Sequence, residues 1–240
     1  MRVLITGGAK ELGRAFSEAV GARGHRLVIT GRDERALDQA GRELAARGIE
    51  VETHVADLGD PRATPKLVES LGPIDVLVNN GALGGPVGRT WEVDEDEWWR
   101  TFEVNLRGLA AATNAALRTM TSGRIVNIVS NAGVHRWPLL SAYSVSKAAV
   151  IKLGENLAIE LKPRPIAVLS YDPGMVDVGL MGRGSRATPD DQDEQRVAQW
   201  AKSQREQGRF TPVEQSARVL ARIVDGEFDH RSGGLVTAAE

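Results

Sequence analysis

Residues 6–13 read TGGAKELG and lie between the apolar run RVLI and the amphipathic stretch RAFSEAV. This order predicts a strand, a glycine-bearing turn and a helix. The first amides of a helix have no intrahelical partner and carry partial positive charge, so a phosphate binds there readily. Gly7, Gly8 and Gly13 allow close approach of the backbone, whereas Glu11 stands where glycine would be the obvious choice. The stretch therefore predicts a phosphate-binding turn with one unusual residue.

Short apolar runs and amphipathic stretches alternate along the whole chain. The runs predict strands at residues 3–5, 27–30, 51–55, 74–78, 125–129, 166–170 and 235–237. The stretches between them predict helices at residues 12–20, 33–47, 94–120, 141–161 and 212–224. Apolar strands separated by helices favour a parallel sheet covered on both faces, with the ligand site at the carboxyl ends of the strands. We expect a single-domain, doubly wound α/β (Rossmann) sheet of about seven strands over residues 1–240.

Composition and charge exclude several classes of protein. The 240 residues are 42% hydrophobic, which suits one compact domain, and the net charge of −2 leaves no basic tract for nucleic acid or an anionic membrane. Cysteine is absent and the four histidines lie far apart, so we expect no disulfide and no metal site. No apolar run is long enough to span a membrane, and Met1 leads directly into the first strand. We therefore expect a cytoplasmic protein.

Residues 181–209 interrupt the alternation with a polar segment that contains GRGSR and DDQDEQR. One interpretation is a mobile insertion with a polar helix on the substrate side of the fold. The alternative, a solvated surface flap without a role, is equally compatible with the composition.

The end of the second predicted strand points to the type of dinucleotide. Proteins that bind NAD usually carry an acidic residue here, whereas an arginine accommodates the 2′-phosphate of NADP. Gly31 leaves room at this point, Arg32 offers a planar set of donors, and Lys10 adds a second positive charge. Asp57, after the third strand, can accept a hydrogen bond from the adenine amino group. The pattern predicts NADP(H) and favours 2′-phosphate binding over the alternative, in which Arg32 caps a loop in solvent.

A serine, a tyrosine and a lysine form the second chemical pattern. Ser130 ends the strand sequence GRIVNIVS, and YSVSK follows at residues 143–147. Tyr143 and Lys147 are four residues apart on a predicted helix, so they share one face. A nearby ammonium favours a phenolate and would lower the pKa of Tyr143 from about 10. Tyr143 would then exchange a proton with a substrate oxygen, Ser130 would hydrogen-bond that oxygen, and a nicotinamide would carry the hydride.

Taken together, these motifs resemble those of the short-chain dehydrogenase/reductase family over nearly the whole chain. The matching segments are TGGAKELG (6–13), VLVNNGA (76–82), VNLRG (104–108), SNAG, YSVSK (143–147) and DPGMV (172–176), in the family's order and spacing. The resemblance implies a catalytic tetrad of Asn105, Ser130, Tyr143 and Lys147. In that tetrad Asn105 would hold a water that relays protons through Lys147. An asparagine whose side chain is also hydrogen-bonded to the backbone is compatible with this role.

The resemblance also implies how the cofactor is bound. Lys147 would contact the nicotinamide ribose, Asn79 would lie under the cofactor, and Pro173, Gly174 and Val176 would lie beside the nicotinamide ring. The expected NADP(H)-binding residues are Gly7, Lys10, Leu12, Gly13, Arg32, Asp57, Leu58, Asn79, Tyr143, Lys147, Pro173, Gly174 and Val176.

Three positions depart from the family pattern. Glu11 replaces the second glycine of the turn, residues 81–82 invert the usual alanine-glycine order, and Val178 stands where a threonine often bonds the carboxamide. We expect Glu11 to point outward or to pair with Lys10 or Arg14, so that the turn still binds NADP(H) with altered affinity.

The segment HRWPLL (135–140) joins Ser130 to Tyr143 and must pass the mouth of the pocket. Trp137 and Leu140 would line an apolar pocket, with His135 or Arg136 supplying a polar group. An equal alternative is that Trp137 packs within the loop and His135 is solvated. Apolar residues of the following loop, namely Met175, Leu180 and Met181, would add a further wall.

The sequence therefore predicts an NADP(H)-dependent oxidoreductase that transfers a hydride between nicotinamide and a small-molecule carbonyl or alcohol. The alternative is a catalytically silent NADP(H)-binding sensor or scaffold on the same fold. A P-loop phosphotransferase is excluded because the turn lacks the Gly-Lys-Ser/Thr ending. In the family the long helices, here 94–120 and 141–161, commonly pair across a dimer axis, so we expect a homodimer, with a homotetramer left open.

Overall fold

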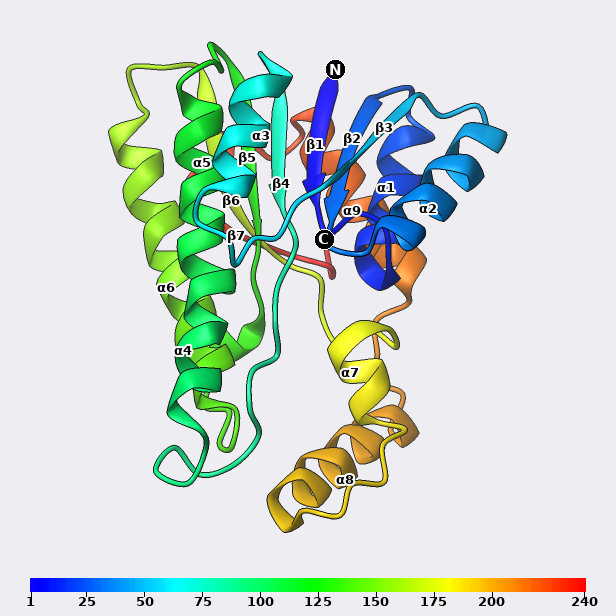
Figure 1. The fold of residues 1–240 in the computed structure, drawn as a ribbon, viewed down its shortest axis with the longest axis vertical. Coiled ribbons are helices and arrows are strands. Elements are labelled where there is room, and N and C mark those ends of the chain that lie inside the picture. The colour runs from blue at the N-terminus through cyan, green and yellow to red at the C-terminus, as the bar shows by residue number, and fades with distance from the viewer.

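Seven parallel strands form one sheet at the centre of the computed structural model, in the order β3-β2-β1-β4-β5-β6-β7 (Figure 1). The strands are β1 (Arg2–Thr6), β2 (Arg26–Gly31), β3 (Val51–Val55), β4 (Val76–Asn79), β5 (Gly123–Ile128), β6 (Ile166–Asp172) and β7 (Leu235–Thr237). The structure describes residues 1–240, except for the side chains of Leu180 and Arg183. The predicted doubly wound α/β fold of about seven strands is confirmed.

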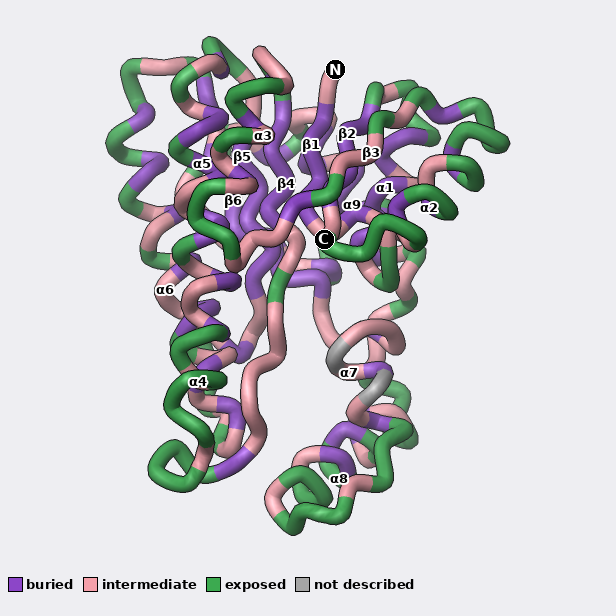
Figure 2. The backbone as a smooth tube through the Cα atoms, viewed as in Figure 1, coloured by how far each residue is buried: buried purple, intermediate pink, exposed green. Residues whose placement is uncertain are grey.

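Helices cover both faces of the sheet. One face carries α1 (Glu11–Gly21), α2 (Glu34–Ala46) and α9 (Val213–Asp225), whose apolar side chains join those of the strands in one buried cluster. The other face carries α3 (Ala63–Leu71), α5 (Leu109–Leu117) and α6 (Ser141–Glu160), which form a second cluster. Figure 2 shows the strands between these layers as the most deeply buried part of the chain. Helix α3 is an addition to the elements that periodicity predicts.

The single helix expected at residues 94–120 is instead built from three pieces. Helix α4 (Glu95–Phe102) begins at Asp94, whose carboxylate accepts a hydrogen bond from the Glu97 amide at 2.8 Å. A π-helical segment (Glu103–Gly108) follows and leads into α5. Such wider turns are rare in proteins overall, but the ones that occur often lie at functional sites. This one contains Asn105.

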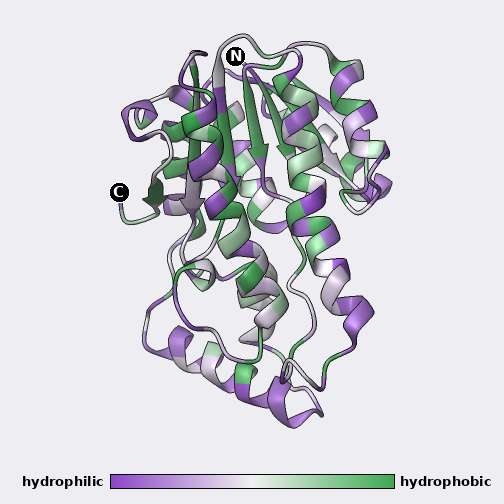
Figure 3. Cartoon of the chain, turned by 90° about the vertical axis from the view of Figure 1, so that its left-hand side faces the viewer, coloured by the Kyte–Doolittle hydropathy of each residue, from purple (hydrophilic) through white to green (hydrophobic). Residues whose placement is uncertain are grey.

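The polar segment 181–209 folds mainly into the end of α7 (Gly179–Gly184) and into α8 (Gln192–Glu206). Both helices lie beyond the carboxyl ends of the strands (Figure 1), and the expected polar helix is α8. Its surface is largely hydrophilic in Figure 3, in contrast to the apolar strands of the sheet. Its N-terminus is capped by Asp191, which accepts from the amides of Asp193 and Glu194.

The topology places any ligand site at one edge of the sheet. The strand order reverses between β1 and β4, which are neighbours although far apart in sequence. Crevices in open α/β sheets form outside the carboxyl ends of strands at such a switch point. Within the described residues, no helix is both long and apolar enough to cross a membrane.

Replacing a buried aromatic side chain with alanine tests the packing of the core. Phe16 is fully buried between α1 and the sheet, so Phe16→Ala is expected to lower the free energy of unfolding by about 3–5 kcal/mol. Trp91 is 80% exposed, and Trp91→Ala is expected to change it by less than about 0.5 kcal/mol. Urea unfolding followed by circular dichroism measures both, and similar losses in the two variants would contradict this core.

Candidate active site

A cleft of about 610 Å³ opens at the carboxyl ends of the strands. It joins the turn after β1 to the loops that follow β2, β4, β5 and β6, so segments from the whole chain meet in it. The predicted residues that line it are Gly7, Lys10, Leu12, Gly13, Arg32, Asp57, Leu58, Ser130, Tyr143, Lys147, Pro173, Gly174 and Val176. The two predicted residues outside this lining are Asn79 and Asn105.

Two glycines of the turn after β1 are required by close packing. Gly7 has a φ of 66°, which side chains rarely adopt. A Cβ on Gly13 would lie 2.0 Å from the Gly7 carbonyl oxygen, so only glycine fits there. Helix α1 begins beside these residues, and its N-cap, Lys10, makes no side-chain cap. The amides of this helix terminus fit the pyrophosphate of a dinucleotide.

Glu11 is exposed, in agreement with the first of its two expected arrangements, in which it points outward. Its φ of 50° lies in the left-handed region that favours glycine, and its side chain lines the cleft. The carboxylate reaches toward α7, since a Cβ on Gly179 would lie 3.2 Å from Glu11 Oε2. The expected pairing with Lys10 or Arg14 is wrong, because Lys10 pairs with Asp33 and Arg14 pairs with acidic residues of α1 and α2.

Basic side chains gather where the 2′-phosphate of NADP was expected. Lys10 Nζ lies 2.5 Å from Asp33 Oδ2, and this hydrogen bond is the main cause of the lowered pKa of Asp33. Asp33 also caps α2 by accepting from the Ala36 amide. Arg32 lines the cleft, and its guanidinium makes no hydrogen bond or ion pair with any described residue. A donor group of this kind fits a phosphate.

Asp57, expected to contact adenine, already has protein partners. Its Oδ1 accepts a hydrogen bond from the Gly59 amide at 2.8 Å, and its Oδ2 lies 3.3 Å from Arg100 Nη2. The adenine contact therefore stays a prediction.

Ser130, Tyr143 and Lys147 are brought together by the end of β5 and the start of α6. Ser130 caps the short 3-10 helix Asn131–Gly133, and its side chain acts on Tyr143 in the direction that lowers the pKa of the phenol. Lys147 is 3% exposed, donates to the Ile128 carbonyl at 2.7 Å and lies 5.7 Å from the centre of the Tyr143 ring. The predicted juxtaposition of the three side chains is thus present.

The expected direction of the Tyr143 pKa is wrong. Burial raises the pKa of Tyr143 to about 12 and outweighs the opposing effect of the hydrogen bond from Ser130. Burial likewise lowers the pKa of Lys147 to about 8. Desolvation dominates because Lys147 is buried and Tyr143 is only partly exposed. The phenol of Tyr143 therefore loses its proton less readily than a free phenol, and the ammonium of Lys147 loses its proton more readily than a free ammonium.

Asn105 and Asn79 lie behind the cleft. The Asn105 side chain accepts from the Leu83 amide at 2.7 Å and donates to the Leu83 carbonyl and to Ser146 Oγ. It thereby fixes the loop after β4 to α6, and its expected part in a water relay stays a prediction. Asn79 is buried and donates to Thr113 and Asn127.

Asn80, which sequence analysis did not select, lines the cleft instead. Its Nδ2 donates to the carbonyls of Thr6 at 2.9 Å and Gly7 at 3.2 Å, so it supports the turn after β1. The sequence contained a signal for Asn80. Strand β4 ends at Asn79, so Asn80 is the first residue of the loop at the carboxyl edge of the sheet.

Asp172 is a second residue that the motif alone did not reveal. This carboxylate at the end of β6 is 9% exposed and accepts hydrogen bonds from the amides of Gly174 (at 3.0 Å) and Asn131. Burial is the main cause of its raised pKa, and its charge raises the pKa of both Tyr143 and Lys147. The sequence contained a signal for this residue, because Asp172 is the acidic residue of the DPGMV motif.

On the substrate side, Trp137, Met175 and Met181 line the cleft as expected, whereas Leu140 is buried outside the lining. His135 and Arg136 are exposed and also lie outside it. The expected contribution of Leu180 lies outside the described side chains.

A model of the short chain dehydrogenase family matches residues 1–189. The chain belongs to this family. Among its relatives, human L-xylulose reductase is 34% identical over 192 residues, which is 78% of this chain and 76% of that protein. Carbonyl reductase [NADPH] 2 of Sus scrofa is 29% identical over 240 residues, or 98% of this chain and 93% of that protein.

A solved structure of NAD⁺-bound xylitol dehydrogenase superposes with a TM-score of 0.87 at 26% identity, covering 98% of this chain and 96% of that one. As a short-chain dehydrogenase, the protein is an oxidoreductase that transfers a hydride and acts on small molecules. The names of its relatives include both NADPH and NAD⁺, so family membership alone leaves the dinucleotide open.

Replacing Asp172 tests the electrostatics of the site. The carboxylate raises the pKa of Lys147, so Asp172→Asn is expected to lower this pKa below about 8 and the ammonium is then lost at a lower pH. Carbon-13 NMR of labelled lysine side chains measures the titration. Asp38→Asn, on the exposed face of α2, serves as the control. An unchanged Lys147 pKa in Asp172→Asn would show that this carboxylate does not act on it.

Proposed function

We propose that the protein is an NADP(H)-dependent reductase that interconverts a carbonyl compound and its alcohol, with Tyr143 as the general acid and base. One observation carries the proposal. Ser130 and Tyr143 lie together with the buried Lys147 in the same cleft as the α1 N-terminus and Arg32. The acid group and the residues that fit a dinucleotide thus face one continuous space.

Each side chain of the site has a separate role in the proposed reaction. When bound, nicotinamide supplies or takes up the hydride. The Ser130 hydroxyl hydrogen-bonds the substrate oxygen, and in reduction Tyr143 donates its proton to that oxygen as it gains charge. The ammonium of Lys147 stabilises the phenolate that remains until it regains a proton. In oxidation the same groups act in reverse, with Tyr143 accepting the alcohol proton.

The preference for NADP(H) is proposed from Arg32 and Lys10. Arg32 lines the cleft after β2, and Lys10 lies across from it, held by Asp33. A planar guanidinium and an ammonium suit a 2′-phosphate, whereas a ribose 2′-hydroxyl is usually held by a carboxylate. Asp33 is an exposed carboxylate that is occupied by Lys10 and by the α2 cap.

Arg32→Gln tests this preference. The variant is expected to bind NADPH about 10- to 100-fold more weakly, because a charge-assisted contact with the 2′-phosphate is lost, and to bind NADH unchanged. Tryptophan fluorescence titration measures both affinities. Arg35→Gln is a matched control, since Arg35 is exposed on α2 and outside the cleft lining. Equal weakening for NADPH and NADH would contradict a 2′-phosphate contact.

Tyr143→Phe tests the acid. The variant is expected to keep NADPH affinity and to lose about 100- to 10,000-fold in kcat, because no other hydroxyl donates the proton. The chain has two tyrosines, and Tyr171→Phe is the matched control. The Tyr171 hydroxyl donates to the Ser216 carbonyl at 2.7 Å, away from the cleft lining, so this variant keeps turnover.

Two results would overturn the proposal. If Tyr143→Phe retains wild-type turnover, Tyr143 is not the general acid. A wild-type protein that binds NADPH and reduces no carbonyl compound would favour the silent sensor or scaffold.

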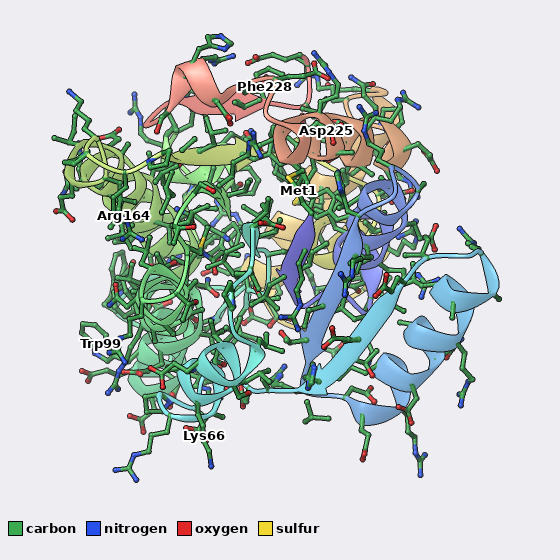
Figure 4. All side chains as sticks on the ribbon, turned by 90° about the horizontal axis from the view of Figure 1, so that it is seen from above. Met1, Lys66, Trp99, Arg164, Asp225 and Phe228 are labelled. Atoms are coloured by element: carbon green, nitrogen blue, oxygen red, sulfur yellow. The ribbon has the colours of Figure 1, made fainter. Side chains whose placement is uncertain are left out.

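The assembly is also proposed. The exposed apolar side chains include Trp99 of α4 and Val145 and Ile159 of α6. Figure 4 shows Trp99 at the periphery of the molecule. We propose that these helices pair in a homodimer, with a tetramer left open. Cytoplasmic localisation, the extent of the single domain over residues 1–240 and the mobility of residues 181–209 stay predictions.

A further inference from the structure

Helix α8 is anchored near its two ends to two different loops, one after β6 and one after β4. Near its C-terminus, Arg205 pairs with Asp177, in the loop that follows β6. Near its N-terminus, the Asp193 carboxylate lies 3.9 Å from Arg89 Nε, in the loop between β4 and α4. These two anchors are twelve residues apart, or about 18 Å along a helix. The helix therefore bridges the loops that border the substrate side.

A pair of tryptophans joins the middle of this bridge to the catalytic loop. The Trp200 ring of α8 packs edge-to-face on the Trp137 ring, with the ring centres 4.9 Å apart and the planes at 74°. Trp137 lies between Ser130 and Tyr143 in sequence, and it lines the cleft that contains both. An edge-to-face pair restrains both rings, so Trp137 presents a fixed aromatic surface.

The lining around Trp137 is apolar. The charged side chains of the described lining come from the turn after β1, from the loops after β2 and β3 and from the catalytic centre, namely Lys10, Glu11, Arg32, Asp33, Asp57, Lys147 and Asp172, and the Glu11 carboxylate extends toward Gly179. The loops beside Ser130 and Tyr143 contribute Leu83, Trp137, Met175, Val178 and Met181, with Asn131 as the polar member.

Such a lining discriminates between kinds of carbonyl compound. A sugar or polyol brings several hydroxyl groups, and each loses its hydrogen bonds to water unless the site replaces them. Apolar and aromatic walls replace few of these bonds, whereas they bury an aromatic substituent favourably.

We propose that the carbonyl substrate bears an aromatic ring that packs against Trp137, with Trp200 of α8 holding Trp137 in place. This assignment rests on the proposed reductase function and adds the substrate class to it. Trp137 is then a specificity-determining residue, and Trp200 is a positioning residue that acts through it.

A matched pair of diketones provides the test. 1-Phenyl-1,2-propanedione and 2,3-butanedione differ only in the replacement of a methyl group by a phenyl ring, and erythrulose represents a hydroxylated ketone. NADPH oxidation by the wild-type protein gives kcat/KM for each compound. The phenyl diketone is expected to exceed the other two by at least about tenfold, because it alone buries a ring against Trp137.

Substitutions of Trp137 and Trp200 distinguish the loss of a ring contact from a general loss of activity. Trp137→Leu keeps an apolar side chain and is expected to reduce kcat/KM for the phenyl diketone about 10- to 100-fold, with butanedione changed less than about threefold. Trp137→Phe is expected to restore most of the loss. Trp200→Leu is expected to show a smaller loss with the same selectivity. Trp91→Leu, 80% exposed and outside the cleft lining, is the control and leaves all three values unchanged. Circular dichroism confirms that each variant is folded.

Each other outcome overturns the inference. If butanedione or erythrulose is reduced as efficiently as the phenyl diketone, the substrate class is wrong although the reductase function stands. The same holds if Trp137→Leu affects the phenyl and methyl diketones equally. If the folded wild-type protein reduces none of the three compounds, the proposed function fails, and the assignment of the substrate class fails with it.

Discussion

The buried ammonium of Lys147 is the constraint on which the site depends. A lysine that is 3% exposed requires fixed partners, and these are the Ile128 carbonyl at the end of β5 and the charge of Asp172 at the end of β6. Both partners exist because β5 and β6 are adjacent, parallel strands. The same enclosure raises the pKa of Tyr143 to about 12. Burial thereby acts on the two groups in opposite directions, because it raises the pKa of the Tyr143 phenol and lowers the pKa of the Lys147 ammonium.

The cofactor end of the cleft combines a well-formed turn with a strained residue. Gly7 and Gly13 pack as a dinucleotide turn requires, and the α1 terminus lacks a side-chain cap. Glu11 adopts a φ of 50° between them, a conformation that costs a non-glycine residue on the order of 1 kcal/mol. Its carboxylate extends toward Gly179 at the start of α7. The turn after β1 and the start of α7 are therefore in contact.

The substrate side depends on segments that are distant in sequence. Helix α8 contacts loops that follow three different strands, through Asp193, Trp200 and Arg205. Asn105 in the π-helical segment fixes the loop after β4, and Trp98 donates to Ser141 at the start of α6. Rigid elements thus hold the side chains of the candidate site, while the polar helix α8 contacts the loops beside them. This division lets one fold present different pockets to a common reaction centre.

The sequence by itself determined the parallel sheet, the glycine turn and the helical spacing of Tyr143 and Lys147, because periodicity and turn chemistry act over a few residues. The family motifs extended this to further lining residues such as Leu58, Pro173 and Gly174, but not to Asn80 or Asp172. Only the tertiary structure decided the direction of the Tyr143 pKa, the position of Glu11, the partners of Asp57, the π-helical segment around Asn105 and the contact of Trp137 with Trp200. Each of these depends on desolvation or on contacts between segments far apart in the chain, and local sequence patterns carry no information on either.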